Sequence, residues 1–136
     1  MARYLADKSA LARVHHEDVF HRISSLYVTG EVATCAIVDL EVLYSARRAD
    51  DHRAIQEDRA FLPRVACGDA AADRAVEVQE LLAETGRHRI PVNDLLVAAA
   101  AERAGLTVLH YDSDFDTIAA VTGQPAEWIV PRGTVP

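Results

Sequence analysis

The chain has 136 residues and a mass of 14.9 kDa, which fits a single domain over residues 1–136. Hydrophobic residues make up 50% and charged residues 26%, the balance of an ordinary globular protein, and with only 6% aromatics Ala, Leu and Val must fill the interior. Helices packed on a sheet are therefore expected, rather than a large aromatic-lined pocket. The net charge of -7 argues against a nucleic-acid partner, unless the acidic residues gather around cations.

The basic residues are nearly all arginine. Lys8 is the one lysine among 14 Lys and Arg residues, and arginine is the better residue for forked phosphate contacts. Five of them fall between Arg47 and Arg64. The simpler interpretation of that cluster is a solvated helix face.

The two cysteines, Cys35 and Cys67, are too few for a disulfide framework and form no C-x-x-C metal pair. Reduced, buried thiols in a cytoplasmic protein are the expectation. We expect no signal peptide, because no basic region followed by an apolar region opens the chain. The longest apolar run, Leu95–Ala101, is too short to span a bilayer, so no membrane partner is expected.

Short strands alternating with helices are predicted along the whole chain. In the first half we expect a strand at 3–6, a helical stretch to about 26, a strand at 31–35, and helices at 37–48 and 50–61. In the second half we expect a strand at 64–67, a helix at 69–85, a helix from 93 or 94 to 104, a strand at 106–110, a helix at 114–121 and a strand at 127–130. The helix at 69–85 is amphipathic, and its predicted apolar face carries Ala72, Val76, Leu81 and Leu82. This order predicts an α/β fold in three layers, with a mostly parallel sheet between helices.

Acidic residues follow the predicted strands, at the edge where parallel sheets bind ligands. Asp7 comes directly after the first strand, Asp112 and Asp114 come after the strand at 106–110, and Asp94 opens the helix before that strand. Any one of Asp7, Asp94 and Asp114 could instead cap a helix. Together, four acids at one edge repel by roughly 4 kcal/mol for each close pair at an effective dielectric near 20. Such a cluster requires raised pKa values or bound cations, and carboxylates without His or Cys favour Mg²⁺ or Mn²⁺.

A further carboxylate is expected from the helix at 37–48. Both Asp39 and Glu41 lie among apolar residues, where an unpartnered carboxylate is costly to bury. Periodicity does not choose between them, and either can reach solvent from the edge of the apolar stripe. Ser9, two residues after Asp7, places a hydroxyl near the same edge. His110 is interpreted as a packed histidine at a strand end.

Four segments together resemble the PIN-domain ribonucleases, and among them the VapC toxins of bacterial toxin–antitoxin pairs. The resemblance runs over essentially the whole chain, and the segments are Y-L-A-D-K-S-A-L, I-V-D-L-E-V-L-Y-S-A-R, P-V-N-D-L-L-V-A-A-A-A and L-H-Y-D-S-D-F-D-T-I-A. The resemblance assigns the second acid to Glu41 rather than Asp39. It leaves open whether Asp112 or Asp114 binds metal directly.

The resemblance implies a ribonuclease that hydrolyses RNA phosphodiester bonds with Mg²⁺, or with Mn²⁺ as a substitute. Asp7, Asp94 and the Asp112/Asp114 pair would hold the metal, and Glu41 would complete the catalytic set. Lys8, Ser9 and Arg47 are weaker candidates for substrate contacts. The implied partners are RNA and a VapB-type antitoxin whose tail covers the acidic groove, bound to a homodimer in a heterotetramer or larger assembly.

Two other functions were weighed against this one. A non-catalytic PIN-like module that binds RNA or protein is the main alternative, and the loss of an acid would favour it, but all the acidic segments retain theirs. A phosphoryl-transfer enzyme of the receiver or haloacid-dehalogenase type would need a lysine late in the chain, whereas Lys8 directly follows Asp7.

Overall fold

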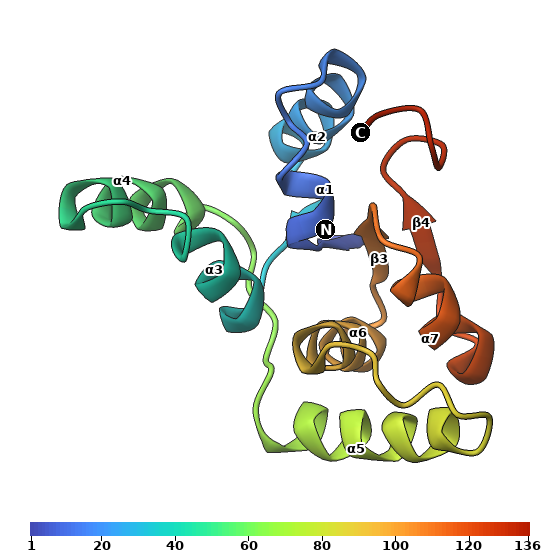
Figure 1. Cartoon of the computed structure of the whole chain (residues 1–136). Helices are drawn as coiled ribbons and strands as arrows, with labels where there is room; N and C mark the ends of the chain where they lie inside the picture. The colour runs from blue at the N-terminus through green and yellow to red at the C-terminus, as the bar shows by residue number, and fades with distance from the viewer.

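The computed structural model describes residues 1–136 and contains one parallel sheet with helices on both faces (Figure 1). The strands are β1 (Tyr4–Ala6), β2 (Val32–Ala33), β3 (Thr107–His110) and β4 (Ala126–Trp128). The helices are α1 (Lys8–Leu11), α2 (Glu17–Val28), α3 (Ala36–Leu43), α4 (Ala49–Arg59), α5 (Asp69–Ala83), α6 (Val92–Ala104) and α7 (Asp114–Thr122). The predicted three-layer α/β class is confirmed.

The sheet order is β2-β1-β3-β4, and every pair of neighbours is parallel. The chain leaves β1 toward β2 on one side, and later returns to place β3 on the other side of β1. The strand order therefore reverses between β1 and β3, which are the central strands. Ligands of such sheets bind at that reversal, beyond the carboxyl ends of the strands.

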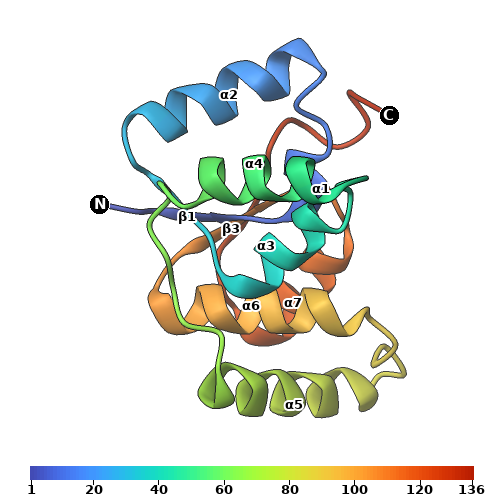
Figure 2. The same cartoon turned by 90° about the vertical axis from the view of Figure 1, so that its left-hand side faces the viewer.

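Successive side chains of the strands point to opposite faces of the sheet and pack into two hydrophobic cores. Leu5 and Val108 point into the larger core with α3, α5, α6 and α7, while Tyr4 and Leu109 point into a smaller core with α1 and α2. The two views of the ribbon show α5, α6 and α7 below the sheet and α1 and α2 above it (Figures 1 and 2). The sheet is thus covered on both faces, and its carboxyl edge stays open. No helix combines the length and the apolar composition needed to cross a membrane.

Four predicted elements differ from the structure, and the strand predicted at 31–35 is reduced to the two-residue β2. The helical stretch to residue 26 is broken into α1 and α2 by a turn at 12–16, which lets Val19 and Ile23 reach the smaller core. The helix predicted at 37–48 ends at Leu43. The strand predicted at 64–67 is a single bridge between Thr34 and Arg64, because β2 is only two residues long and offers no ladder to extend.

The apolar face predicted for the helix at 69–85 is wrong for two of its four members, and a third, Ala72, is only partly buried. Leu82 is buried as predicted, but Val76 is 65% exposed and Leu81 38% exposed. The buried face is instead Ala71, Ala75, Val78 and Leu82. Small alanines let α5 pack closely on the alanine-rich α6, so the larger Val76 is left on the outside.

Candidate metal centre

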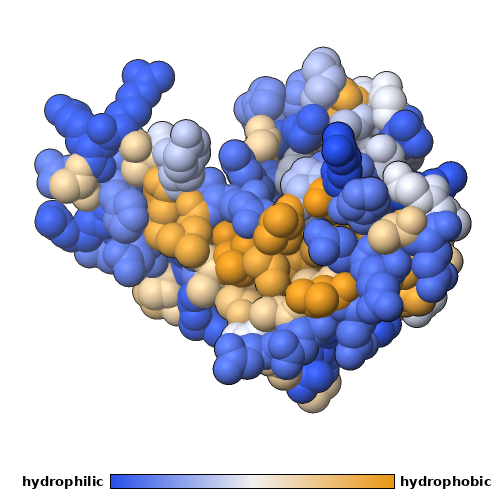
Figure 3. Space-filling model, turned by 60° about the horizontal axis from the view of Figure 1, so that its bottom comes forward, coloured by the Kyte–Doolittle hydropathy of each residue, from blue (hydrophilic) through white to orange (hydrophobic).

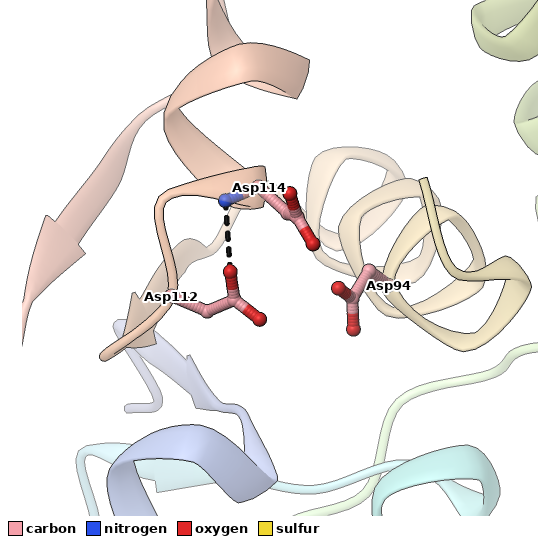
Figure 4. A group of neighbouring side chains, drawn as sticks. All are labelled: Asp94, Asp112 and Asp114. Atoms are coloured by element: carbon pink, nitrogen blue, oxygen red, sulfur yellow. Dashed lines mark hydrogen bonds between the residues drawn. The ribbon is translucent and has the colours of Figure 1, made fainter. Parts of the chain in front are cut away.

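Three carboxylates from two distant segments meet at the open edge of the sheet. Asp94 lies in the first turn of α6, Asp112 in the loop after β3, and Asp114 at the start of α7. Each offers an oxygen, and these oxygens lie within 4.8 Å of one another. The side chains point into one space, as Figure 4 shows. Their spacing is that of a group of ligands around a single small cation.

Asp112, the first acidic residue of the loop after β3, stabilises the conformation of that loop. Asp112 Oδ1 accepts a hydrogen bond from the Asp114 backbone N–H at 2.9 Å, drawn as the dashed line in Figure 4. This contact supports the first turn of α7 and turns both carboxylates toward Asp94. Asp114 has no side-chain hydrogen bond of its own, and Asp112 keeps its second oxygen. Both members of the pair can therefore offer an oxygen to a cation.

Asp7 approaches the same space from the end of β1. Its backbone N–H donates to the Leu109 carbonyl of β3 at 2.9 Å, which joins the ends of the two central strands. Its Oδ2 accepts the Ser9 N–H at 2.9 Å and so caps α1. Its Oδ1 is buried and has no hydrogen-bond partner. Asp7 thus combines helix capping with a buried oxygen that has no partner, and from outside the group of three its charge raises the pKa of Asp94.

Capping does not explain Asp94 or Asp114, although the Asp112 carboxylate accepts a backbone N–H in the first turn of α7. The N-cap of α6 is Pro91, and the N-cap of α7 is Ser113, so neither Asp94 nor Asp114 occupies a cap position. The capping interpretation therefore holds for Asp7 and is wrong for Asp94 and Asp114.

Glu41 borders the acidic group from α3. Its Oε1 is buried without a partner, and its side chain lines a depression of about 450 Å³ with Lys8, Leu40, Tyr44 and Asn93. Asp39 is engaged elsewhere: its carboxylate accepts hydrogen bonds from Thr34 Oγ1, Arg59 Nε and Arg64 Nη2. The structure therefore places Glu41 beside Lys8 and Asn93, near the acidic group, and engages Asp39 in an ion cluster with Arg59 and Arg64.

Burial and mutual repulsion raise the pKa values of these acids. Burial raises the pKa of Asp94 to about 8, with further contributions from Asp7, Asp112, Asp114 and Glu41 in that order. Burial is also the first cause of the raised pKa of Asp7, Glu41 and Asp114. Repulsion from Asp7 adds to it for Glu41 and repulsion from Asp112 for Asp114, whereas at Asp7 hydrogen bonding by Ser9 opposes burial more than Asp112 supports it. A divalent cation would remove both the repulsion and the cost of burial.

Side chains around the loop after β3 hold its backbone in place. His110 is fully buried, and its Nδ1 accepts the Asp112 N–H at 3.1 Å. Burial lowers the pKa of His110, so the neutral ring that can accept this bond is favoured. Ser9 Oγ accepts the Tyr111 N–H at 2.9 Å. His110 supports the site without facing it, a role that a strand-end histidine in the sequence does not reveal.

The weaker candidates fall at different distances from the acids. Lys8 lines the depression beside Glu41. Asn93, which directly precedes Asp94, lines it too, although nothing in the sequence pattern marks it as a site residue. Arg47 is exposed in the connection between α3 and α4 and lines neither depression at the acidic group.

The residues present fit a hard divalent cation. All the donors are carboxylate oxygens, and Asp7 Oδ1 and Glu41 Oε1 are buried without a hydrogen-bond donor. Buried carboxylate oxygens without a partner are costly, and a cation supplies the missing positive charge. Oxygen ligands select Mg²⁺ or Mn²⁺ over softer metals.

Comparison with known proteins identifies the family. Residues 4–121 match the family model of the PIN domain. The chain is 47% identical over 134 residues to Ribonuclease VapC21 of Mycobacterium tuberculosis, with 97% of each chain covered. It is 42% identical over 133 residues to Ribonuclease VapC51 of the same species, covering 98% of this chain and 97% of the relative. The chain belongs to the PIN-domain family and, within it, to the VapC ribonucleases.

Solved PIN-domain structures share the fold. The DNA-bound VapBC from Salmonella typhimurium superposes with a TM-score of 0.78 at 18% identity, covering 96% of this chain and 100% of the other. VapBC-5 of Mycobacterium tuberculosis, from the VapBC family of toxin-antitoxin systems, superposes with a TM-score of 0.59 at 28% identity, covering 94% and 98%. The family resemblance seen in the four acidic segments is therefore confirmed, and the acidic group lies inside the matched PIN region.

Proposed function

We propose that this chain is the toxin of a toxin–antitoxin pair and hydrolyses RNA phosphodiester bonds with Mg²⁺ or Mn²⁺ at the acidic group. The observation that carries the proposal is the convergence of Asp94, Asp112 and Asp114 at the reversal of strand order. Membership of the VapC ribonucleases supports RNA as the substrate.

In this proposal Asp7, Asp94, Asp112 and Asp114 hold the metal. A bound divalent ion would supply positive charge to the phosphodiester and make an attacking water more acidic. The chain contributes the oxygens and keeps them in place through the Asp112–Asp114 and Asp7–Ser9 hydrogen bonds. No protein nucleophile is required.

Glu41 is proposed to act as a general base, which accepts a proton, in addition to its effect as a negative charge. Its side chain is only half-buried and lines the depression beside Lys8 and Asn93, where a water can approach the carboxylate. Burial raises the pKa of Glu41, and repulsion from Asp7 adds to it. A carboxylate with a raised pKa accepts a proton more readily near neutral pH, as a general base must.

Among the candidates for substrate contact, Lys8 has the strongest support. It lines the depression beside Glu41 with Tyr44 and Asn93, where a cation can meet a phosphate close to the acids. Ser9 donates its backbone N–H to Asp7 and accepts from Tyr111, so its role is to position the loop. Arg47 could meet only a substrate that extends beyond the acidic group.

Two exposed apolar surfaces support the proposed protein partners. Figure 3 shows apolar side chains gathered on one face of the molecule. Val76 of α5 and Val92 of α6 are 65% and 63% exposed and line a depression of about 240 Å³, which we propose as the homodimer surface. A second depression of about 310 Å³ lies along α2, with Val14, Phe20 and Tyr27 in its lining, and we propose it for the VapB-type antitoxin. Contiguous exposed apolar side chains are typical of such interfaces.

The decisive experiment is RNA cleavage by the antitoxin-free protein with Mg²⁺ or Mn²⁺, on tRNA and ribosomal fragments. We expect cleavage that EDTA abolishes and that falls at least about 100-fold in Asp94→Asn. Asp73→Asn, which alters an exposed acid of α5, is the matched control and should cleave normally. Metal titration by calorimetry gives a second readout, because Asp94→Asn should weaken Mn²⁺ binding while Asp73→Asn should not.

Failure of this experiment has a clear meaning. Cleavage undiminished in Asp94→Asn would contradict the assignment of the acidic group. If no RNA is cleaved with either metal, the chain is better described as a non-catalytic module that binds RNA or protein through a PIN fold.

A further inference from the structure

A depression of about 440 Å³ adjoins the acidic group on the side away from α3. It shares Ser9 and Asp112 with the loops that form the acidic site. The rest of its lining comes from Arg13, Tyr111, Trp128, Arg132 and the C-terminal segment. In Figure 1 this segment runs back from β4 toward α1 and α2, on the opposite side of the sheet edge from α3.

Two arginines line this depression, and they differ in their partners. Arg13 donates to the Ser9 carbonyl at 2.7 Å and to a main-chain oxygen of Pro136, the final residue, at 3.0 Å, so its guanidinium is engaged. Arg132 is exposed and forms no ion pair. In a chain with a net charge of -7, positive charge is thus held next to the acidic group. It would attract an anionic substrate that the acids alone repel.

An aromatic side chain completes the lining. Trp128, the single tryptophan of the chain, packs 5.2 Å from the Tyr111 ring and 5.0 Å from the His110 ring. Its Nε1 donates to Asp116 Oδ2 at 3.1 Å, and the Arg132 guanidinium lies 5.5 Å from its ring centroid. The indole is therefore held firmly while its partly exposed surface lines the depression.

The wall formed by the C-terminal segment is also fixed in place. Tyr111 Oη donates to the Val135 carbonyl at 2.7 Å and accepts the N–H groups of Gly133 and Val135 at 2.9 and 3.2 Å. The Arg13 guanidinium lies 4.6 Å from the Tyr111 ring centroid. The depression is thus preorganised, which lowers the entropic cost of binding.

We propose that this depression binds a nucleotide of single-stranded RNA next to the bond that is cut. Arg132 contacts its phosphate, and Trp128 contacts its base or ribose. Guanidinium groups beside an aromatic ring are the combination that binds unpaired nucleotides. The proposal rests on the proposed ribonuclease function, because the nucleotide is assigned to a position next to the acidic group, where the RNA would be cut.

The single tryptophan makes the proposal directly measurable. In the Asp94→Asn background, which prevents cleavage, a short single-stranded oligoribonucleotide should quench Trp128 fluorescence. Arg132→Gln should weaken this binding about 5- to 10-fold and reduce its dependence on salt by about one unit of log–log slope. Arg132→Lys should recover part of the affinity, since it keeps the charge. Arg103→Gln, an exposed arginine in the last turn of α6, is the matched control and should bind like the parent.

Steady-state kinetics on the otherwise unchanged protein separate binding from chemistry. Arg132→Gln should raise KM about 5- to 10-fold and leave kcat unchanged, because the residue contacts a flanking nucleotide. Equal KM values for Arg132→Gln and Arg103→Gln, in a protein that still cleaves RNA, would overturn the subsite and leave the ribonuclease function standing.

Other outcomes are equally informative. RNA that binds by anisotropy without changing Trp128 fluorescence would also overturn the subsite. Quenching by an octaglutamate peptide but not by RNA would assign the depression to an acidic protein segment instead. A protein that neither binds nor cleaves RNA would remove the subsite together with the proposed function.

Discussion

Asp94 is the residue at which the electrostatics of the site concentrate. Burial and four neighbouring acids raise its pKa from 3.8 to about 8. Between these two pH values the folded protein holds a proton at Asp94 that the unfolded chain has released. The metal-free protein therefore loses stability as the pH rises from about 4 to about 8, and the penalty is complete above the folded pKa.

Asp94→Asn removes this charge with little change in volume. We expect the metal-free variant to be more stable than the metal-free wild type at pH 8, by about 1–3 kcal/mol, and this difference to shrink by pH 5. Urea denaturation in EDTA at both pH values measures it. Mg²⁺ should stabilise the wild type and have little effect on the variant. A variant that is no more stable than the wild type at pH 8 would contradict the assigned repulsion.

His110 acts on the site through the backbone of Asp112. His110→Phe keeps a ring against Phe115 and Trp128 but removes the acceptor of the Asp112 N–H. We expect it to lower the free energy of unfolding by about 1 kcal/mol, because a partly buried N–H loses its acceptor. His88→Phe, at an exposed position, should change stability by less than about 0.5 kcal/mol. Thermal or urea denaturation distinguishes the two.

At the scale of elements, a buried cluster of ion pairs and hydrogen bonds connects α4 to α3. Arg59 near the end of α4 donates Nε to Asp39 Oδ1 at 2.7 Å and Nη2 to Thr34 Oγ1 at 2.8 Å, and Arg64 contacts the other oxygen of Asp39. The Arg59 and Asp39 side chains are only 10% and 13% exposed. Burial raises the pKa of Asp39, but these hydrogen bonds outweigh it and hold the pKa below the usual value.

Asp39→Asn should destabilise the protein by about 3 kcal/mol, because the buried Arg59 loses its charged partner. Asp50→Asn, which removes an exposed pair with Arg53 at 3.6 Å, should cost less than about 0.5 kcal/mol. Per folded molecule, Asp39→Asn should retain RNA cleavage, whereas Glu41→Gln should lose cleavage and keep its stability. Loss of cleavage in Asp39→Asn together with normal cleavage in Glu41→Gln would contradict the choice of Glu41.

At the scale of the whole molecule, the exposed face of α5 and α6 predicts self-association. Val76 and Val92 present apolar surface there that a monomer would leave in water. A homodimer formed through this face would cover it. The acidic group would remain open, because it lies at the carboxyl edge of the sheet.

We expect the wild type to sediment as a dimer at micromolar concentration and Val76→Asp to sediment as a monomer, since a buried unpaired carboxylate is costly at an apolar interface. Val28→Asp alters another exposed valine, which is 87% exposed at the end of α2. It should leave the dimer intact. Analytical ultracentrifugation measures both variants, and a dimer that persists in Val76→Asp would place the interface elsewhere.

The sequence by itself determined the fold class and the positions of the central elements. Alternation of strands and helices and glycine at the end of α6 are local properties, and they predicted β1, β3, α6 and α7 to within about two residues. Parallel topology then placed Asp7, Asp94, Asp112 and Asp114 at one edge, because the carboxyl ends of parallel strands share it.

The tertiary structure decided what depends on contacts between distant segments. It separated Glu41 from Asp39 by pairing Asp39 with Arg59 and Arg64, which lie 20 and 25 residues away. It buried the alanines of α5 rather than Val76, because close helix packing outweighs side-chain hydrophobicity. It also brought Arg13 and Trp128 to the same depression beside Asp112. No sequence periodicity predicts these contacts, since they form only when the strands pair and bring distant segments of the chain together.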